Sequence, residues 1–468
     1  MYEYEFNIIA NVFTLQRKIY KQSMKKKKIQ VVENPRIHEI LGPAIRFFEL
    51  EQASGLFLIV VAIVALIWAN SPFASTYFGI QESKISFGFG EFKIEKDFLH
   101  WINDGLMAVF FFVVGLEIKR ELLIGELSSV KNAMLPIAAA LGGMIFPAVI
   151  YALINVNGET AKGWGIPMAT DIAFAIGILS ILGNRIPLAL KVFLTAVAII
   201  DDLGAVLVIA IFYSANISLL ILGLAAIVIL ILVLLNYLQI KSPLVYAIFG
   251  ILLWFLFLKS GVHSTIAGVV LALTIPTKTR INGKKFFEEA NSALHKLQDK
   301  GLAKEGHTIS PDVNEVIYTI EDYCEKATAP AHRLEHKLHP YVAFFIMPVF
   351  ALVNAGVAIG GVGSNVFNGV TLGIVAGLLI GKVLGISLFS ILAVKSGFAA
   401  LPSGTSFKQL AGAGFLAGIG FTMSLFIANL AFGSPELLNF AKAGIIAGSI
   451  LSGVVGFLVL RKEQHIRN

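Results

Sequence analysis

Cysteine and charge are both scarce in this chain. Cys324 is its single cysteine, so internal disulfides are excluded, and no cysteine and histidine spacing for zinc can be drawn from it. Charged residues make up 14% of the 468 residues and hydrophobic residues 56%, whereas a soluble domain has about 25% charged residues. A soluble fold of this size would lack the polar side chains to cover its surface. The composition predicts an all-α, polytopic membrane protein surrounded by lipid bilayer, and no motif indicates a cofactor.

Apolar stretches of membrane-spanning length recur along the chain. A bilayer core about 30 Å thick requires roughly 20 mostly apolar residues per helix. Twelve stretches separated by polar, glycine or proline breaks fit this length and predict 12 transmembrane helices. They cover residues 52–70, 98–117, 133–154, 165–183, 188–213, 217–238, 243–259, 261–276, 340–360, 367–394, 408–432 and 438–460. The first eight occupy residues 52–276 and the last four occupy residues 340–460.

The basic residues fall mainly on one side of these spans. Of the 37 lysine and arginine residues, 30 lie before the first span, after an even-numbered span or after the last one. Cytoplasmic loops of membrane proteins carry such an excess, so both termini are predicted to be cytoplasmic in a bacterial inner membrane. The basic residues form no single domain, which argues against a nucleic-acid partner.

Three polar segments on the predicted cytoplasmic side are not membrane spans. Residues 1–51 form a basic N-terminal extension, in which Met24, directly before four lysines, is an alternative start. Residues 277–339 form a loop insert, in which KKFFEEANSALHKLQDK predicts a solvated helix. Residues 461–468 form a short tail.

Residues 84–97, on the predicted outer side, have the pattern of a β-hairpin. Apolar and polar side chains alternate there around Gly88 and Gly90. Because a lone hairpin is only marginally stable in water, we expect it to pair with a second copy of the chain in a homodimer.

Five ionisable residues stand out away from the ends of the predicted spans: Asp104, Asp171, Asp201, Asp202 and Lys382. Such a group near the bilayer centre costs about 2.5 to 3.5 kcal/mol, so each needs a partner or a function. Asp201 and Asp202 adjoin in an otherwise apolar helix, where mutual repulsion and burial suit the pair to holding protons or a small hard cation. Lys382 lies too far from the ends of its span to snorkel. It would neutralise helix C-terminal ends or pair with Asp201.

Two of the predicted spans carry helix-breaking residues. In span 4, Gly163, Gly165 and Pro167 precede Thr170 and Asp171, and either polar residue would cap a new helix start. In span 11, a run of glycines precedes a second pair of polar residues in GAGFLAGIGFTMSLFIANL. The two spans are the middle members of spans 3–5 and 10–12, which would run in opposite orientations. Two inverted three-helix repeats with discontinuous helices 4 and 11 are typical of secondary transporters.

Seven strings between about residues 40 and 460 together resemble one family, the NhaA Na+/H+ antiporters. The strings are NDGLMAVFFFVVGLEIKREL, IPMATDIAFAIGIL, AIIDDLGAVLVIAIFY, RLEHKLHPYVAF, VNAGV, GLLIGKVLGISLF and GIGFTMSLFIANLAF. The resemblance implies an ion site formed by Asp201 and Asp202, with Asp202 the strongest candidate ligand of Na+ or Li+. It also implies that Lys382 pairs with Asp201 or compensates the crossed helix ends.

The same resemblance implies roles for three further polar residues near the site. Thr170 and Asp171 match the polar pair at the break of the fourth span. Asp104 matches an acidic residue near the cytoplasmic funnel or the ion site.

A cytoplasmic cluster that responds to pH is also implied by the resemblance. Its members here are Glu117, Lys119, Arg120 and Glu121 after the second span, and Glu335, His336 and His339 before the ninth. Histidine changes charge near neutral pH, which suits such a cluster to sensing internal pH. An ordinary basic membrane interface would have a similar composition. The long insert and the lysine-rich extension depart from the compact members of the family and put the pH profile in doubt.

Other functions fit parts of the sequence less well. His332, Glu335 and His336 form an HxxEH string, but no third zinc ligand is indicated. An intramembrane aspartyl protease would use Asp171 and Asp202, but its GxGD signature is absent and Lys382 has no place in its chemistry. A cation channel usually has a ring of identical groups, whereas this chain supplies one asymmetric site.

The closest alternative is a Na+-coupled symporter on the same inverted-repeat plan, but the chain offers few polar groups for an organic substrate. The sequence therefore predicts an electrogenic, pH-regulated Na+(Li+)/H+ antiporter, a transporter and not an enzyme, that works by alternating access.

Overall fold

The computed structural model describes residues 51–87, 94–183, 186–214, 217–279, 281–299, 311–358 and 367–463. The predicted N-terminal extension, apart from its last residue, and most of the predicted tail lie outside these residues. Residues Ser54–Asn468 cluster into one compact unit, and the fold described here is that of its described part.

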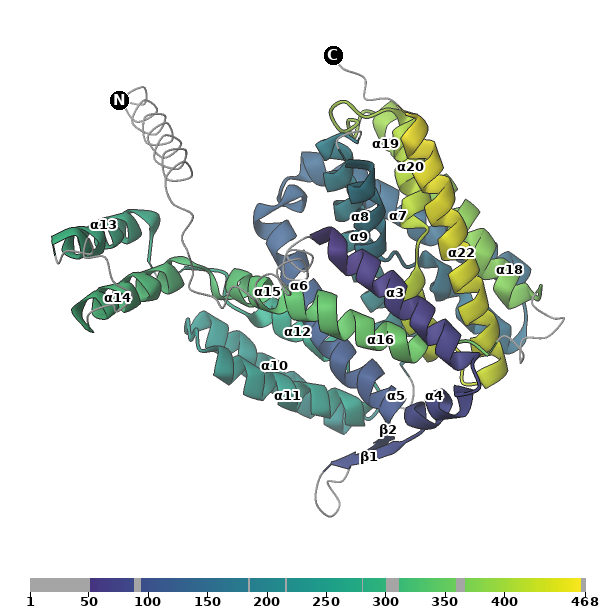
Figure 1. Cartoon of the computed structure of the whole chain (residues 1–468), viewed down its shortest axis with the longest axis horizontal. Coiled ribbons are helices and arrows are strands. Elements are labelled where there is room, and N and C mark those ends of the chain that lie inside the picture. Colours follow the sequence, from purple (N-terminus) through teal and green to yellow (C-terminus); the bar gives the residue numbers. More distant parts are fainter. Residues whose placement is uncertain are drawn as a thin grey trace, which may run out of the picture. The chain divides into compact units, whose positions relative to one another are not determined.

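The described chain is almost entirely helical, with a single two-stranded sheet among its described residues (Figure 1). The elements of its first half are α3 (Glu51–Ala69), α4 (Ala74–Gln81), β1 (Lys84–Phe87), β2 (Ile94–Asp97), α5 (Phe98–Trp101), η2 (Ile102–Leu106), α6 (Met107–Ile124), η3 (Glu126–Ser128), α7 (Val130–Ile154), η4 (Gly158–Met168), α8 (Ile172–Leu182), α9 (Leu188–Phe212), α10 (Leu219–Tyr237), α11 (Pro243–Ser260) and α12 (Ile266–Thr274). Those of its second half are α13 (Gly283–Asp299), α14 (Pro311–Ala327), α15 (Pro330–Tyr341), η6 (Val342–Ile346), α16 (Met347–Asn354), α18 (Gly369–Ala376), η8 (Gly377–Gly381), α19 (Lys382–Lys395), α20 (Phe407–Ala417), α21 (Phe421–Ala431) and α22 (Pro435–Lys462).

The apolar helices confirm an all-α membrane protein. Among the described residues, seven helices are long and apolar enough to cross a bilayer, or up to ten if each sharply bent helix pair is one span. Two predicted spans fall short of this test. The helix that ends with α6 carries four charged residues in its last turns, and α12 has only nine residues, about 14 Å at 1.5 Å per residue.

Three local features differ from the sequence prediction. The helix that contains the ninth predicted span begins at Pro330, ahead of the predicted membrane boundary at 340, because α15, η6 and α16 continue as one helix whose first turns are polar. The insert contains two helices, α13 and α14, that pack together around Ala293, Val313 and Val316. The short helix α4 was not predicted. It follows α3 at an angle of 110°.

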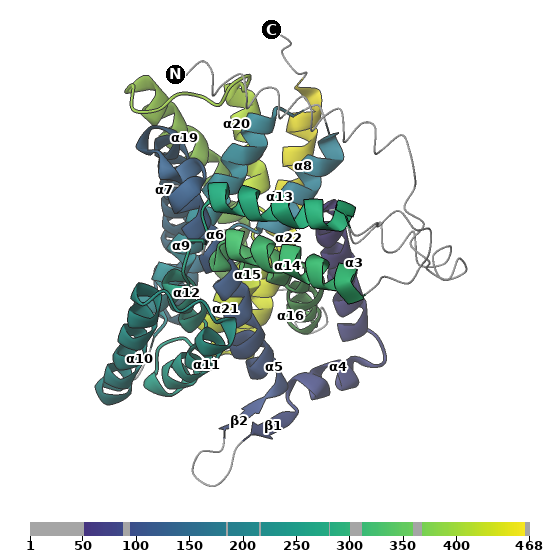
Figure 2. The same ribbon diagram turned by 90° about the vertical axis from the view of Figure 1, so that its left-hand side faces the viewer.

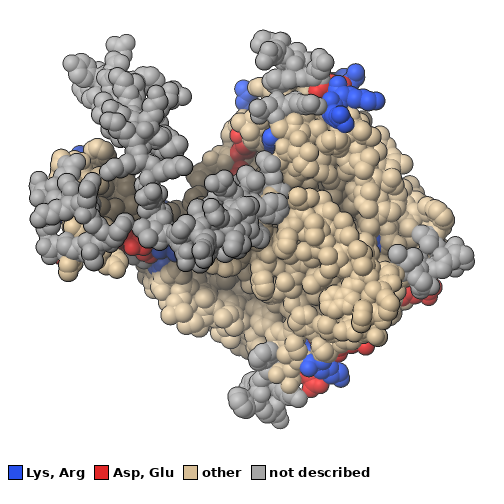
Figure 3. Space-filling view, viewed as in Figure 1, with Lys and Arg blue, Asp and Glu red and all other residues tan. Residues whose placement is uncertain are grey.

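The outer surface carries the apolar residues that a bilayer requires. Along α3, Leu56, Val60, Ile63 and Ile67 recur at helical spacing on one face and are half exposed or more. Figure 3 shows one face of the molecule, on which uncharged residues form a broad area and the charged residues gather toward its margins. Exposed leucine, valine and isoleucine in this pattern are the expected lipid contact.

The membrane helices pack as two groups that meet along a seam (Figures 1 and 2). The crossed-helix group consists of α7, η4, α8, α9, α18, η8, α19, α20, α21 and α22. The flanking group consists of α5, η2, α6, α10, α11, α12, α15, η6 and α16. The groups touch where α6 meets α9 and where α16 meets α21.

Close backbone contact ties the crossed-helix group together at α7 and α19. A Cβ added to Gly142 would lie 2.2 Å from the carbonyl oxygen of Gly385, and one added to Gly385 would lie 2.0 Å from that of Gly142. Only glycine at both positions lets the helices approach this closely, as is common between membrane helices.

The predicted hairpin is present as an antiparallel pair of strands. Lys84 of β1 lies opposite Asp97 of β2, and Ile85 lies opposite Lys96. The turn with Gly88 and Gly90 lies outside the described residues.

Candidate functional site

Both predicted helix breaks are present, and they lie against each other. The helices η4 and α8 are bent by 41° at residues 169–171, and α20 and α21 by 46° at residues 418–420. Pro167, which has no amide hydrogen, ends η4, and Ala169 and Asp171 follow in extended conformation. In α20–α21 the break falls on glycines. A Cβ at Gly418 would lie 2.3 Å from Leu378 O, so the approach of η8 requires glycine there.

The two breaks are joined by hydrogen bonds between the broken helices. The backbone N–H of Asp171 donates to Ile419 O at 2.6 Å, and Ser424 Oγ donates to Ile166 O at 2.8 Å. Thr170 Oγ1 lies 2.8 Å from Ala417 O, at the C-terminal end of α20. These bonds satisfy backbone groups that a helix break would otherwise leave unpaired in an apolar interior.

Asp171 caps the N-terminal ends of both second half-helices. Its Oδ1 accepts the backbone N–H of Phe174 in α8 at 3.3 Å, and its Oδ2 accepts that of Thr422 in α21 at 3.1 Å. The hydroxyl of Thr422 donates to Oδ2 as well. A helix N-terminus carries a partial positive charge, so one buried carboxylate here serves two of them. The two half-helix N-termini at the crossing therefore share a single capping side chain, which is 1% exposed.

Asp201 of α9 lies beside this crossing and is bound by Lys382. The Nζ of Lys382, the first residue of α19, is 2.5 Å from Asp201 Oδ2, and the side chains of both residues have no exposed surface. Thr170 Oγ1 is 2.7 Å from the same oxygen. Of the two partners predicted for Lys382, Asp201 is therefore the one that it contacts. The other oxygen, Asp201 Oδ1, is buried and has no hydrogen-bond partner among the described residues.

Asp202, the next residue, is held by no comparable contact. Its side chain is buried, with the residue 2% exposed, and its Oδ1 has no hydrogen-bond partner among the described residues. A buried carboxylate without a partner is unfavourable. Binding a proton or a cation removes this cost. Of the oxygens of the two neighbouring carboxylates, Asp201 Oδ2 is hydrogen-bonded, whereas Asp201 Oδ1 and Asp202 Oδ1 are free to bind a proton or a cation.

Asp104 does not join the Asp201 and Asp202 site. Its Oδ2 is 2.5 Å from Nζ of Lys96 in β2, and its carbonyl oxygen accepts the indole N–H of Trp254 at 2.9 Å. These contacts connect it to the hairpin. No contact in the described chain connects it to the other predicted site residues.

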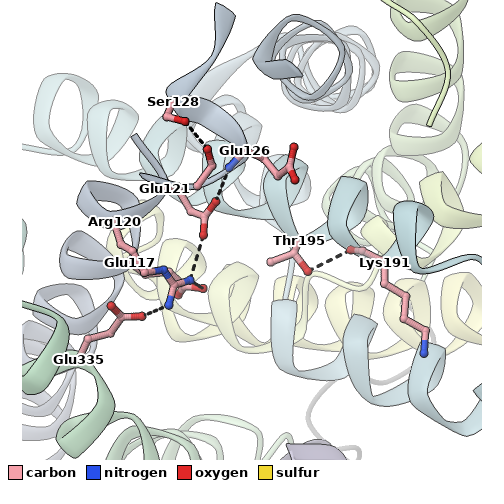
Figure 4. A network of polar contacts seen from close by, with 9 residues as sticks. Glu117, Arg120, Glu121, Glu126, Ser128, Lys191, Thr195 and Glu335 are labelled. Carbon is pink, nitrogen blue, oxygen red and sulfur yellow. Dashed lines mark hydrogen bonds and ion pairs between the residues drawn. The ribbon is translucent and has the colours of Figure 1, made fainter. Parts of the chain in front are cut away.

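Four of the seven residues predicted for pH sensing form one network (Figure 4). Arg120 pairs with Glu335 of α15 and, at 3.0 Å, with Glu121, and its guanidinium is 3.9 Å from Glu117. Glu121 also accepts the backbone N–H of Glu126 at 3.1 Å. The network therefore ties the end of α6 to α15.

The other three residues predicted for pH sensing lie apart from that network. Lys119 donates to the carbonyl oxygens of Leu273 and Ile275 at the end of α12. His336 and His339 are exposed on α15 and make no hydrogen bond or ion pair within the described chain. Likewise, no group of three or more His, Cys, Asp or Glu side chains in the described ranges is arranged to hold a metal ion.

The sequence indicates the carboxylates but not how Thr422 is used. Thr422 is one of the two polar residues that follow the glycines of span 11. An Asp after one break and a Thr after the other, each at the start of a half-helix, would have indicated that the two ends share a cap.

Two interrupted helices that cross at buried carboxylates and a buried lysine define an ion-coupled secondary transporter. Comparison with known proteins identifies its family. The family described as Na+/H+ antiporter 1 matches residues 45–460. The chain belongs to this family.

Its relatives match along nearly their whole length. The chain is 50% identical over 431 residues to the Na+/H+ antiporter NhaA of Oleidesulfovibrio alaskensis, covering 91% of this chain and 95% of the relative. It is 46% identical to NhaA 1 of Saccharophagus degradans over 446 residues (93% and 96%) and 46% identical to NhaA of Citrobacter koseri over 424 residues (89% and 97%). The predicted family is confirmed, and the protein is a secondary transporter and not an enzyme. The symporter alternative is not supported.

Replacing Asp171 by alanine should destabilise the protein more than replacing Ser406, the N-cap of α20. Loss of an ordinary cap costs about 1 kcal/mol, whereas Asp171→Ala leaves unpaired the buried N–H of Thr422, at about 1 to 3 kcal/mol, and the part-buried N–H of Phe174 as well. The melting temperature in detergent, read from the soluble fraction after heating, measures the difference. Equal losses for Asp171→Ala and Ser406→Ala would show that the shared cap does not hold the crossing.

Proposed function

We propose that the chain exchanges Na+ or Li+ for H+ at Asp201 and Asp202. The observation that carries this proposal is the contrast between the two neighbours: Asp201 is paired with Lys382, while Asp202 is buried with an unpartnered oxygen. With both carboxylates ionised, Asp202 is the main ligand of a dehydrated cation. Oxygens of Asp201, Thr170 or the backbone complete the shell that a hard cation requires.

Protons and Na+ compete for these carboxylates. A proton on Asp202 removes the charge that holds the cation, so acidity on one side of the membrane favours release there. We propose that two protons enter for each Na+ that leaves, one on Asp202 and one held by the Asp201–Lys382 pair, so that the cycle moves net charge. The 2.5 Å contact between Lys382 Nζ and Asp201 Oδ2 supports this assignment, because a change at either group is felt directly by the other.

Alternating access follows from motion of the crossed-helix group against the flanking group. The proposed ion-binding residues, with the crossing itself, all belong to the crossed-helix group, which meets the flanking group where α6 packs on α9 and α16 packs on α21. We propose that this group moves as one body and presents the site to each side in turn. Asp171 keeps the crossing intact during that motion, while Asp104 stays with the hairpin outside the exchange chemistry.

We propose 12 spans, two inverted repeats and cytoplasmic termini in a bacterial inner membrane. The repeats are α7, η4–α8 and α9 on one side, and α18–α19, α20–α21 and α22 on the other. The middle helix of each is broken, by 41° and 46°, which supports a common plan. The boundaries that we propose are the extension 1–51, spans within 52–276 and 340–460, the insert 277–339 and the tail 461–468.

We propose a homodimer formed through the hairpin 84–97. A two-stranded sheet gains stability when further strands pair with it. The strands β1 and β2 form such a sheet, which the hairpin of a second copy would extend. Light scattering of the solubilised protein with and without residues 84–97 decides between dimer and monomer.

Internal pH is proposed to act through the Arg120–Glu335 network. This network joins α6 to α15, and a change of charge near it alters the balance of attractions that hold the two helices. His336 and His339 lie exposed on the same helix, α15, and histidine is the residue type suited to sensing pH near neutrality.

Asp202→Asn should abolish exchange, because an amide neither releases a proton nor supplies a charged ligand. The measurement is proton flux in everted vesicles of an antiporter-deficient bacterium, reported by dequenching of a pH dye on addition of Na+, Li+ or K+. The parent chain is expected to respond to Na+ and Li+. Full exchange by Asp202→Asn would refute the site.

His336→Ala should shift the pH range of exchange at an unchanged maximal rate, because it removes a histidine next to Glu335 of the network. The rate is followed between about pH 5 and 8, the range in which histidine as a residue type changes charge. His295→Ala, on the insert helix α13, is the matched control. A profile identical to that of the parent would remove His336 from the sensor.

Cys324 provides a test of topology without any mutation. It is exposed on α14 in the proposed cytoplasmic insert, so an impermeant thiol reagent should label it in everted vesicles and not in intact cells. As a control, Ser83→Cys in a Cys324→Ser chain should be labelled in intact cells, since Ser83 precedes the hairpin. Labelling of Cys324 from outside would reverse the orientation.

A further inference from the structure

Three asparagine side chains form a hydrogen-bonded layer at the seam between the two helix groups. Asn354 of α16, which is 0% exposed, lies at its centre. Its Nδ2 donates to Asn103 Oδ1 of η2 at 2.9 Å and to Phe350 O at 2.9 Å. Its Oδ1 accepts from Asn429 Nδ2 of α21 at 3.0 Å and from Asn103 Nδ2 at 3.4 Å. The hydrogen-bonding capacity of the central amide is therefore fully used by its protein neighbours.

A layer of buried phenylalanine rings lies next to the amides. The ring centroid of Phe426 on α21 is 5.4 Å from that of Phe111 on α6 and 6.2 Å from that of Phe350 on α16. All three residues are 1% exposed or less. The rings therefore close the space between the three helices without a polar group among their side chains.

The spacing on α21 sets the order of the layers. Thr422, Phe426 and Asn429 follow one another at i, i+4 and i+7, so they lie on one face of the helix. Thr422 belongs to the crossing, where its backbone N–H is capped by Asp171. Moving from the crossing toward the C-terminal end of α21, one passes first the rings and then, about 10 Å from Thr422, the amides.

Both layers are shared between the two helix groups. Phe426 and Asn429 belong to the crossed-helix group, while Phe111, Phe350, Asn103 and Asn354 belong to the flanking group. The bond from Asn429 to Asn354 and both contacts of Phe426 therefore cross the seam. Any motion that separates the groups at this level must break all three contacts.

We propose that these six residues are the outer gate of the ion pathway. The inference rests on the proposed exchange function and orientation, in which this end of α21 faces outward. The rings keep water and protons from the carboxylates while the site faces inward. The amides join the groups without a charge that would trap a cation. Amide hydrogen bonds between membrane helices are individually weak, so the gate can reopen in every cycle, and its oxygens then become neutral ligands for a passing Na+.

The first test measures uncoupled proton flux in proteoliposomes of the full chain. A potential is imposed by K+ and valinomycin in the absence of Na+ and Li+, and a trapped pH dye reports proton entry. Asn354→Ala and Phe426→Ala are expected to raise this entry about tenfold or more over the parent chain, as a continuous water path would. Entry at the level of the parent in both variants would overturn the proposal.

Asn155→Ala is the matched control. Asn155 is also a buried amide, and it donates to Gly369 O at 2.8 Å, but this contact joins α7 to α18 inside the crossed-helix group. This variant is expected to leave proton entry low. Proton entry as large as that of Asn354→Ala would mean that general loosening causes the leak, and the gate would be rejected.

The second test holds the gate closed and does not depend on a destabilising alanine. In a Cys324→Ser chain, Asn354→Cys and Asn429→Cys are oxidised to a disulfide that joins α16 to α21. Na+/H+ exchange is expected to stop on oxidation and to return on reduction. Exchange at full rate in the bridged protein, or failure of the two cysteines to bridge, would overturn the proposal.

Different results would refute the exchange function and the gate. If the parent chain shows no cation-dependent proton flux, the exchange function fails. If the parent exchanges and Asp202→Asn does not, while the gate variants neither leak nor lock, only the gate fails.

Discussion

The structure depends on satisfying four helix ends in the middle of an apolar protein. A helix that stops inside a membrane leaves backbone donors or acceptors that no water can reach. Here two such helices cross, and Asp171 accepts backbone N–H groups from both α8 and α21. At the opposite ends, Thr170 and the backbone N–H of Asp171 donate to carbonyl oxygens at or just past the end of α20, and Ser424 donates to Ile166 O of η4. Because the ends stabilise each other, the break costs little, and it leaves polar groups where an ion can be bound.

The carboxylates of Asp171 and Asp202 differ in how fully they are hydrogen-bonded. Asp171 makes three hydrogen bonds and is committed to structure, whereas Asp202 has a buried oxygen without a partner in the described chain. Asp171, at the start of α8, and Asp201 and Asp202, in α9, thus differ in the contacts that their carboxylates make. Asp201 stands between them, since Lys382 neutralises it and Thr170 binds it. In the proposed mechanism, aspartate serves structure, coupling and ligand binding according to what surrounds it.

The sequence alone predicts the features that follow from hydropathy and from the free-energy cost of placing ionisable residues in a membrane. Apolar length gave most helices, and the buried Asp201, Asp202 and Lys382 could be named because ionisable groups in a membrane need a reason. Neutral polar residues gave no such signal: Asn103, Asn354 and Asn429 are far apart in the sequence, and only packing brings them together. Hydropathy does not reveal that the helix of the ninth span extends back to Pro330, because the first turns of α15 are polar. Asp104 was assigned by resemblance, and its partner Lys96 comes from a strand that spacing alone does not position.

Thr170 links the chemistry of the site to the shape of the protein. Its Oγ1 lies within hydrogen-bond distance of both Asp201 Oδ2 and Ala417 O, but a hydroxyl has one proton to donate. When Asp201 is ionised, the carboxylate is the stronger acceptor and the carbonyl at the end of α20 loses its partner. When Asp201 is neutralised, the hydroxyl can turn to that carbonyl. In the proposed exchange, the end of α20 would thus respond to the charge of Asp201, because one hydroxyl rotation at Thr170 would change how firmly the two half-helices are tied.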